Sequence, residues 1–279
     1  QAGGAGMTAE LESFDPGGLG RREPYDHRAR SVAVADRFVA ALPAGAVDLV
    51  DLGCGLGSNL RWLAPRIDRP QRWVLLDHDV ELLGRLEETL RAWARSTGRG
   101  VTPAGDGLRV GRRRIDLRAP EPWPEADGIV TQALLDLVDE RWLGSLVQRL
   151  AGRPLLAALT VDGRVGWSPP RADDAEVNRA FRAHQTRGKP GVWAAPWLAG
   201  RLAAAGYEVA LAEADWRVAH DPSTLGDLVA GFAGAAGEIL GDPAVAGWRS
   251  AREADRAAGT LEVTVGHLDL VAVDPRRAG

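Results

Sequence analysis

Residues 47–57 read VDLVDLGCGLG, and this stretch limits the possible folds more than any other part of the chain. An apolar run ends in Asp51, and glycine then occupies every second position, at Gly53, Gly55 and Gly57. Leucine and alanine follow at helical spacing. The pattern predicts a buried strand over 47–52, a tight glycine loop and a helix to about residue 64. Because glycine has no Cβ, a ligand can lie against the backbone N–H groups of such a loop.

The spacing of the glycines narrows the class of ligand. A dinucleotide fingerprint needs glycine where this chain has Ser58, and a phosphate-binding loop needs a lysine that is absent here. An acid two residues before G-x-G-x-G resembles motif I of the class I S-adenosylmethionine-dependent methyltransferases. That cofactor carries an ammonium, a carboxylate and a sulfonium but no phosphate. The resemblance places Asp51 near its cationic groups, and along the cofactor it places Gly53, Cys54, Gly55, Gly57 and Asn59. We interpret the Cys54 thiol itself as packing.

A second apolar strand, expected over 72–77, ends in Asp77, which lies twenty residues beyond Gly57. An acid at about this distance binds ribose hydroxyls in dinucleotide folds. Asp77 therefore matches the ribose-binding acid of the family, although a capping role is the alternative, and His78 is expected beside the cofactor. Asp79 is interpreted as the N-cap of a helix over 79–97.

Short apolar runs alternate with helical patterns along the chain, which predicts a doubly wound, mostly parallel sheet. The resemblance implies a Rossmann-like sheet of seven strands with an antiparallel last strand. It also brings Asp116, Leu117, Thr131 and Gln132 to the cofactor. The remaining elements are expected as a helix at 26–41, strands at 108–116, 154–161, 207–216 and 260–273, and helices at 140–150 and 196–205. The fourth strand is expected within 128–138, where it runs into a loop.

Two segments lie outside this pattern. Residues 1–36 are expected to be a tag remnant, 1–6, followed by an N-terminal segment that is irregular over 8–24 and acts as a lid. Residues 37–279 would form the methyltransferase domain, interrupted by an insertion at about 163–193. This insertion should follow the fifth strand, which is expected to end near Val161, and contain a helix from Asp173 or Asp174 to His184. We expect it to be a substrate lid, because ligands bind beyond the carboxyl ends of such strands.

A charged cluster at 22–31 stands at the start of the first expected helix. In relatives, an arginine or tyrosine of such a helix can meet the methionine carboxylate, which here would be Arg28 or Tyr25. The alternative is a solvated helix start with Asp26 as its N-cap.

Methyl transfer needs a general base only when the acceptor is protonated at neutral pH. The candidates are His184, His27 and Asp136, with His267 as a further histidine in a suitable region. For each of them a structural role is the alternative. No spacing indicates a metal site.

The composition limits the kinds of partner and the location that can be expected for this protein. A net charge of −4 argues against a nucleic-acid partner. The five arginines between 109 and 118 are interpreted as a solvated face, on an expected hairpin. The single cysteine and the absence of a long apolar run predict a cytoplasmic protein without a membrane span. The hypothesis is a methyltransferase acting on a small molecule, with the acceptor atom and oligomeric state open. The alternatives are an RNA or protein methyltransferase, and a cofactor-binding protein without methyl transfer.

Overall fold

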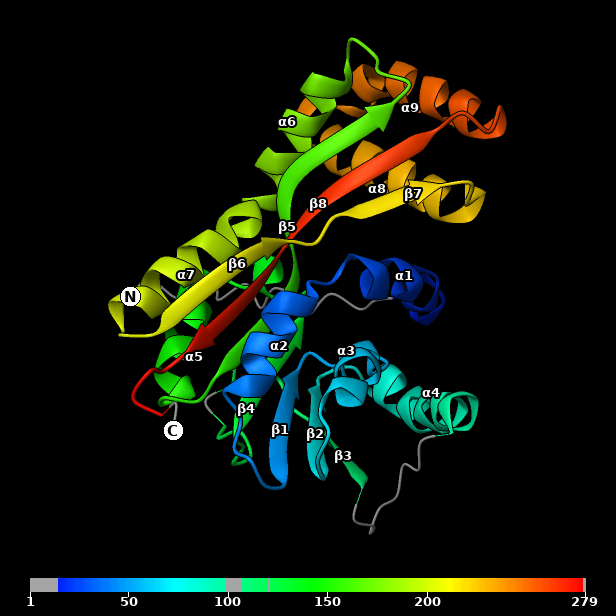
Figure 1. Cartoon of the computed structure of the whole chain (residues 1–279). Coiled ribbons are helices and arrows are strands. Elements are labelled where there is room, and N and C mark those ends of the chain that lie inside the picture. The colour runs from blue at the N-terminus through cyan, green and yellow to red at the C-terminus, as the bar shows by residue number, and fades with distance from the viewer. Residues whose placement is uncertain (1–14, 99–106, 120, 278–279) are drawn as a thin grey trace, which may run out of the picture.

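Eight strands form one sheet in the computed structural model, which describes residues 15–98, 107–119 and 121–277. Their order is β3-β2-β1-β4-β5-β8-β6, with β7 also pairing with β8 (Figure 1). Among the described strands only β8 runs against its neighbours, since β1 to β5 pair in parallel and β8 is antiparallel to β5, β6 and β7. The strands are β1 Val47–Leu52, β2 Gln71–Asp77, β3 Leu108–Arg114, β4 Gly128–Gln132, β5 Leu155–Ser168, β6 Glu208–Glu213, β7 Trp216–Ala219 and β8 Glu262–Val273.

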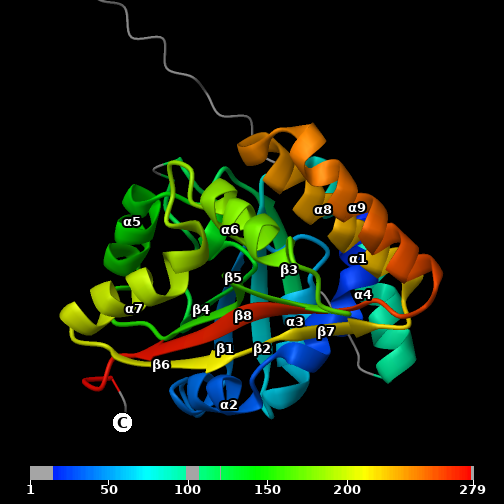
Figure 2. The same ribbon diagram turned by 90° about the horizontal axis from the view of Figure 1, so that it is seen from above.

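Helices cover both faces of the sheet, which explains why β1 is buried along almost its whole length. One core joins the sheet to α2, α3 and α4, and the other joins it to α5 and α7. Figure 2 shows α5 and α7 on one side of the strands and α2 on the opposite side. The helices are α1 Pro16–Ala29, α2 Val32–Ala40, α3 Ser58–Leu63, α4 Val80–Thr97, α5 Glu140–Leu150, α6 Asp174–Gln185, α7 Ala194–Ala204, α8 Pro222–Leu240 and α9 Asp242–Ala257, with 3₁₀ turns η1 Ala64–Arg66, η2 Leu135–Leu137 and η3 Gly191–Trp193.

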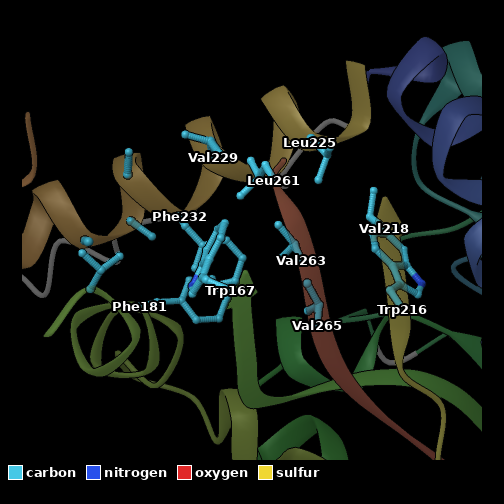
Figure 3. Packing of buried hydrophobic residues seen from close by; sticks show 14 of the residues in the cluster. Trp167, Phe181, Trp216, Val218, Leu225, Val229, Phe232, Leu261, Val263 and Val265 are labelled. Carbon is cyan, nitrogen blue, oxygen red and sulfur yellow. The ribbon is translucent and has the colours of Figure 1, made fainter. Parts of the chain in front are cut away.

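A third core lies beyond the carboxyl ends of the parallel strands. There α6, α8 and α9 pack on the C-terminal half of β5, on the N-terminal half of β8 and on β7 (Figure 3). Trp167 of β5 stands edge-on to Phe232 and Trp248, with ring centroids 5.2 and 5.0 Å apart. We call this group of elements (β5 from residue 161, α6, β7, α8, α9 and β8 to residue 265) the outer module. It adds a wall above the edge of the sheet where ligands bind in open α/β folds.

The outer module accounts for most differences from the expected elements. Strand β5 does not end near Val161 but runs to Ser168, paired with β8 across two register shifts. The single strand expected at 207–216 is divided into β6 and β7, which raises the number of strands to eight. The helix expected between Asp173 or Asp174 and His184 is confirmed as α6.

The sequence pattern did not predict helices α8 and α9. Helix α8 contains four glycines, each costing roughly 1 kcal/mol of helix propensity relative to alanine, so local preference does not favour it. Its buried face, with Leu225, Val229 and Phe232, packs into the outer module, and this packing stabilises the helix. The cap Asp221, followed by Pro222, is a sequence signal for its start.

The N-terminal region also differs from expectation. The helix expected at 26–41 is two helices, α1 and α2, and α1 already begins at Pro16. Asp15 caps α1 by accepting hydrogen bonds from the N–H groups of Gly17 and Gly18, so Asp26 is not the N-cap and lies inside the helix. The earlier part of the expected irregular segment lies outside the described residues. None of the described helices has the length and apolar character needed to cross a membrane.

Candidate functional site

The glycine loop joins β1 to α3 in the expected way. The N–H groups of Gly53 and Cys54 donate to the carbonyl of Leu76 at 2.9 and 3.0 Å, which ties the loop to the end of β2. Gly55 and Gly57 have φ values of +52° and +78°, where a Cβ is strained. A Cβ on Gly57 would also lie 2.9 Å from a methyl group of Leu86. The loop therefore needs glycine at these positions.

Asp77 connects this loop with the end of the second strand. Asp77 is 5% exposed, and its carboxylate accepts a 2.8 Å hydrogen bond from the N–H of Gly55 and a 3.0 Å bond from that of Asp79. His78 lies beside it, with Nδ1 3.3 Å from the Asp77 carboxylate. Asp79 caps α4 through the N–H groups of Glu81 and Leu82, which confirms its expected role. The ribose-binding role of Asp77 stays a prediction.

A chain of side-chain hydrogen bonds crosses the carboxyl edge of the sheet. Asp51 accepts from the Asn59 amide at 3.1 Å, and the Asn59 carbonyl accepts from Arg30 Nη1 at 2.7 Å. Arg30 Nη1 also donates to Gln132 at 3.3 Å, and the Gln132 amide donates to Asp26 at 3.0 Å. The chain thus links the ends of β1 and β4 with α3 and α1. Arg30 belongs to the charged cluster at 22–31, but Arg28 and Tyr25 were the residues expected at the cofactor.

Burial shifts the charges of this chain. Asp51 is fully buried, and desolvation raises its pKa to about 7. Burial likewise raises the pKa of the half-buried Asp26 to about 7, while Arg22 and Arg30 oppose the shift. Burial lowers the pKa of Arg30 to about 10, so its guanidinium keeps its charge at neutral pH. Both acids can therefore exchange a proton near neutrality.

Within this chain of hydrogen bonds, three buried polar atoms have no hydrogen-bond partner among the described residues. They are Asp51 Oδ2, Arg30 Nε and Arg30 Nη2. One is an acceptor on an acid and two are donors on a cation. The Arg30 guanidinium also stacks on the Trp62 ring, 4.1 Å from its centroid. Leaving such atoms unpaired costs free energy, which a ligand that offers both an ammonium and a carboxylate would recover.

Tyr25 and Arg28 lie on another side of α1. The Tyr25 hydroxyl donates to Asp221 at 2.8 Å, and the Arg28 guanidinium stacks on the Tyr25 ring at 4.5 Å. Both line an open pocket of about 480 Å³ together with Ala29, Glu213, Asp215 and Arg217. Their expected contact with the cofactor carboxylate stays a prediction. At this end of α1, Arg30 is the arginine that is linked to Asp51 through Asn59. Because Asp26 and Arg30 are four residues apart, they share one helical face, and this spacing is a sequence signal for the pair.

The other expected cofactor residues line the same edge of the sheet. Asp116, in the loop after β3, is bound by the Arg118 side chain, and the Leu117 carbonyl accepts from the Trp142 indole at 2.8 Å. Thr131 is buried in β4 and donates to the Leu52 carbonyl at 2.8 Å. Cys54 is buried, and burial raises the pKa of its thiol well above the ordinary value.

The candidate bases are dispersed. His27 lies near the glycine loop, with Nε2 3.1 Å from Ser58 Oγ and 3.4 Å from Glu23, and burial lowers its pKa. His184 lies in the outer module, where Nε2 is 3.2 Å from Glu238 of α8. Asp136 is buried in η2, and His267 is buried beside Trp216 of β7. These four groups lie on four different elements, α1, α6, η2 and β8. Across the described residues, no three histidine, cysteine or acidic side chains are placed to share a metal ion.

The arginine-rich strand also differs from expectation. Strand β3 is not part of a hairpin, because it pairs in parallel with β2. Arg112 donates to the Leu83 carbonyl, Arg113 to the Pro122 carbonyl and Arg114 to the His78 carbonyl.

Comparisons with known proteins agree with the motif. No family model matches the chain. Over 185 residues it is 30% identical to a protein named trans-aconitate 2-methyltransferase from Streptomyces avermitilis, a match that covers 66% of this chain and 61% of the relative. The chain thus spans less than two thirds of that relative.

Two solved structures share only a loose likeness with the chain. The YcgJ protein of Bacillus subtilis is 12% identical, with a TM-score of 0.47, and the alignment covers 88% of this chain and 99% of that chain. A geranyl diphosphate C-methyltransferase from Streptomyces coelicolor A3(2) is 14% identical, with a TM-score of 0.42 and coverage of 87% and 80%.

Features of the chain itself and of its curated relative point to the same family. The acid and the glycines of the loop stand at the end of β1, Asp77 stands at the end of β2, and the reversed strand β8 lies between β5 and β6. The sequence match to a named methyltransferase supports the same conclusion. In its glycine motif and strand order the chain resembles the class I S-adenosylmethionine-dependent methyltransferases, and the relative that it matches is named a methyltransferase.

Proposed function

We propose that this protein transfers a methyl group from S-adenosylmethionine to a small-molecule acceptor. The observation that carries the proposal is the set of unpaired buried atoms on Asp51 and Arg30. The amino-acid end of the cofactor carries an ammonium, which suits Asp51 Oδ2, and a carboxylate, which suits Arg30 Nε and Nη2. A planar guanidinium can meet a carboxylate with two parallel hydrogen bonds.

The rest of the cofactor would follow the edge of the sheet. Asp77 would accept the ribose hydroxyls, and the loop residues Gly53, Cys54, Gly55 and Gly57 would leave room for the adenosine. The adenine would lie near His78, Asp116 and Leu117, and the methionine part near Asn59, Thr131 and Gln132. Tyr25 and Arg28 would reach the cofactor from α1 only after giving up their contacts with Asp221 and with each other.

S-adenosylmethionine supplies an electrophilic methyl group on its sulfonium. The residues of the chain would hold the acceptor in line with that methyl group and exclude water, which is the main catalytic task in such a displacement. Where the acceptor arrives protonated, a base would take its proton, and the candidates are His27, His184 and Asp136. Asp26 is a further candidate, because its half-buried carboxylate has a pKa of about 7 and accepts a hydrogen bond from the Gln132 amide.

The outer module is the proposed wall of the acceptor site. It includes the larger part of the segment 163–193, expected from the sequence to be a substrate lid, and it lies beyond the carboxyl ends of the parallel strands. Its core contains Trp167 and Trp216, and the open pocket between α1 and the β6–β7 edge adjoins it. Trans-aconitate, from the name of the curated relative, is the first acceptor to test.

A nucleic-acid acceptor is not favoured. Arg112, Arg113 and Arg114 already donate to backbone carbonyls, and the chain carries a net charge of −4. We therefore propose a metabolite as the acceptor. We also propose that the protein acts in the cytoplasm.

Calorimetry with S-adenosylhomocysteine tests cofactor binding. Asp51→Asn and Arg30→Gln should each weaken binding by about 1.5–3 kcal/mol, the range for hydrogen bonds to charged groups. Arg37→Gln is the matched control, because Arg37 pairs with Glu208 on the surface. Transfer of a labelled methyl group to trans-aconitate tests the reaction. Binding without any methylated product would favour a cofactor-binding protein without methyl transfer, and no binding at all would refute the proposal.

A further inference from the structure

Asp269 is a buried acid that the proposed reaction does not use. It lies on β8, is 1% exposed, and uses both carboxylate oxygens. Oδ2 accepts a 2.8 Å hydrogen bond from the N–H of Ser31, and Oδ1 accepts a 2.8 Å bond from the N–H of Leu159. One side chain thus holds two backbone segments that are far apart in sequence.

Both segments have unusual backbone geometry. Ser31 separates α1 from α2 and caps α2, and the residue before it, Arg30, ends α1 in an extended conformation. Leu159 has a φ of +55° and lies within the first register shift of β5. A non-glycine residue with positive φ is uncommon and needs support from its surroundings. Asp269 supplies that support and fixes the joint of α1 and α2 against the sheet.

The direction in which Arg30 leaves this joint decides what it can reach. Its Nη1 points to Asn59 and Gln132, and Nε and Nη2 stay unpaired among the described residues. The acids that favour its charged form are Asp269, Asp51 and Asp26, with Asp269 the strongest. A buried cation without such partners would be strongly destabilising. Asp269 is thus bonded to the residue directly after Arg30, and its negative charge favours the charged guanidinium.

We propose that Asp269 is a positioning residue, which holds Arg30 so that its free N–H groups face the carboxylate of the bound cofactor. The inference rests on the proposed function, because it assigns a role within the cofactor site. It predicts selectivity as well as affinity. Loss of Asp269 should affect ligands that carry the amino-acid group and spare those that carry only the adenosine.

Two ligands separate these effects. S-adenosylhomocysteine carries the carboxylate, and 5′-methylthioadenosine has the same adenosine and thioether without the amino-acid group. In calorimetry, Asp269→Asn should weaken binding of S-adenosylhomocysteine by about tenfold or more, the scale of a lost charge-assisted contact. Binding of 5′-methylthioadenosine should change by less than about twofold, the usual limit for independent sites. Asp274→Asn is the control, because Asp274 is a buried acid just beyond β8 that binds Arg276.

Coupling to Arg30 is the second readout. On an Arg30→Gln background, Asp269→Asn should cost less than about twofold in affinity for S-adenosylhomocysteine, because the contact it supports is already lost. A merely structural role would instead weaken both ligands equally and give additive losses. Either result would overturn the inference.

A pair of variants at Ser31 covers the case in which Asp269→Asn does not fold. Ser31 has a φ of −75°, and Arg30 before it has a ψ of 137°, so proline is compatible with both. Ser31→Pro removes the N–H that Asp269 accepts, and both Ser31→Pro and Ser31→Ala remove the hydroxyl that caps α2. Only the proline variant should lose selectivity for S-adenosylhomocysteine, and equal behaviour of the two would refute the role of Asp269.

The two proposals fail in different ways. If the unchanged protein binds neither ligand, the proposed function is wrong and the inference falls with it. If it prefers S-adenosylhomocysteine and Arg30→Gln removes that preference, but Asp269→Asn and Ser31→Pro do not, only the inference is wrong.

Discussion

Arg30 and Asn59 meet through a 2.7 Å hydrogen bond that connects the end of α1 to the glycine loop. The same Asn59 side chain donates to Asp51 through its amide nitrogen. One neutral residue thus separates a buried cation from a buried acid and is bonded to both. This arrangement keeps the acid and the cation from pairing directly, so each retains free atoms for a ligand.

Replacing Asn59 tests this arrangement. Asn59→Ala should destabilise the protein by about 1–3 kcal/mol, because a buried donor and acceptor lose their partner. It should also weaken binding of S-adenosylhomocysteine, since Arg30 and Asp51 would be free to collapse onto each other. Chemical denaturation and calorimetry measure the two effects. Asn178→Ala is the control, because Asn178 accepts from Trp167 in the outer module, and it should lower stability while leaving the affinity unchanged.

Binding should release a proton from Asp51. Burial raises its pKa to about 7, so the acid is partly protonated in the free protein at neutral pH. A ligand ammonium next to it favours the ionised form and lowers the pKa. The affinity for S-adenosylhomocysteine should therefore rise with pH up to about 7 and then level off. Calorimetry in buffers of different ionisation enthalpy measures the released proton. Proton uptake, or the same release in Asp51→Asn, would contradict the assignment.

Asp77 and Asp79 offer a matched pair at the end of β2. Asp77→Ala should weaken binding of S-adenosylhomocysteine by about 1.5–3 kcal/mol if the carboxylate accepts the ribose hydroxyls. Asp79→Ala removes the cap of α4 and should lower stability by about 1 kcal/mol with little change in affinity. Calorimetry and thermal melting distinguish the two. Unchanged affinity in the Asp77 variant would exclude the residue from the site.

The stability of the protein should depend on pH through Asp26. Its pKa in the folded protein is about 7, above the ordinary value, so folding favours the protonated form. The resulting stabilisation is complete below the unfolded pKa and is lost as the pH rises through about 7. Asp26→Asn lacks this loss. The melting temperature of Asp26→Asn minus that of the unchanged protein should therefore grow as the pH rises from 4 to 8. A constant difference across that range would contradict the shift.

The sequence alone determined the elements that depend on neighbouring residues. The apolar run, Asp51 and the alternating glycines specified β1, the loop and α3, because the strand and the turn follow from local side-chain pattern and from backbone freedom. The spacing to Asp77 and the cap Asp79 specified β2 and the start of α4. The reversed last strand followed from the family that these residues resemble.

Tertiary structure decided the parts that depend on long-range contacts. Arg30, Asn59 and Gln132 lie on three different elements, and only their packing brings them into one hydrogen-bonded chain. The continuation of β5 to Ser168 depends on pairing with β8, and α8 forms despite its glycines because its apolar face is buried there. Asp269 reaches Ser31 across 238 positions of sequence. Such contacts leave no local pattern, because what stabilises them is the burial of groups from distant segments.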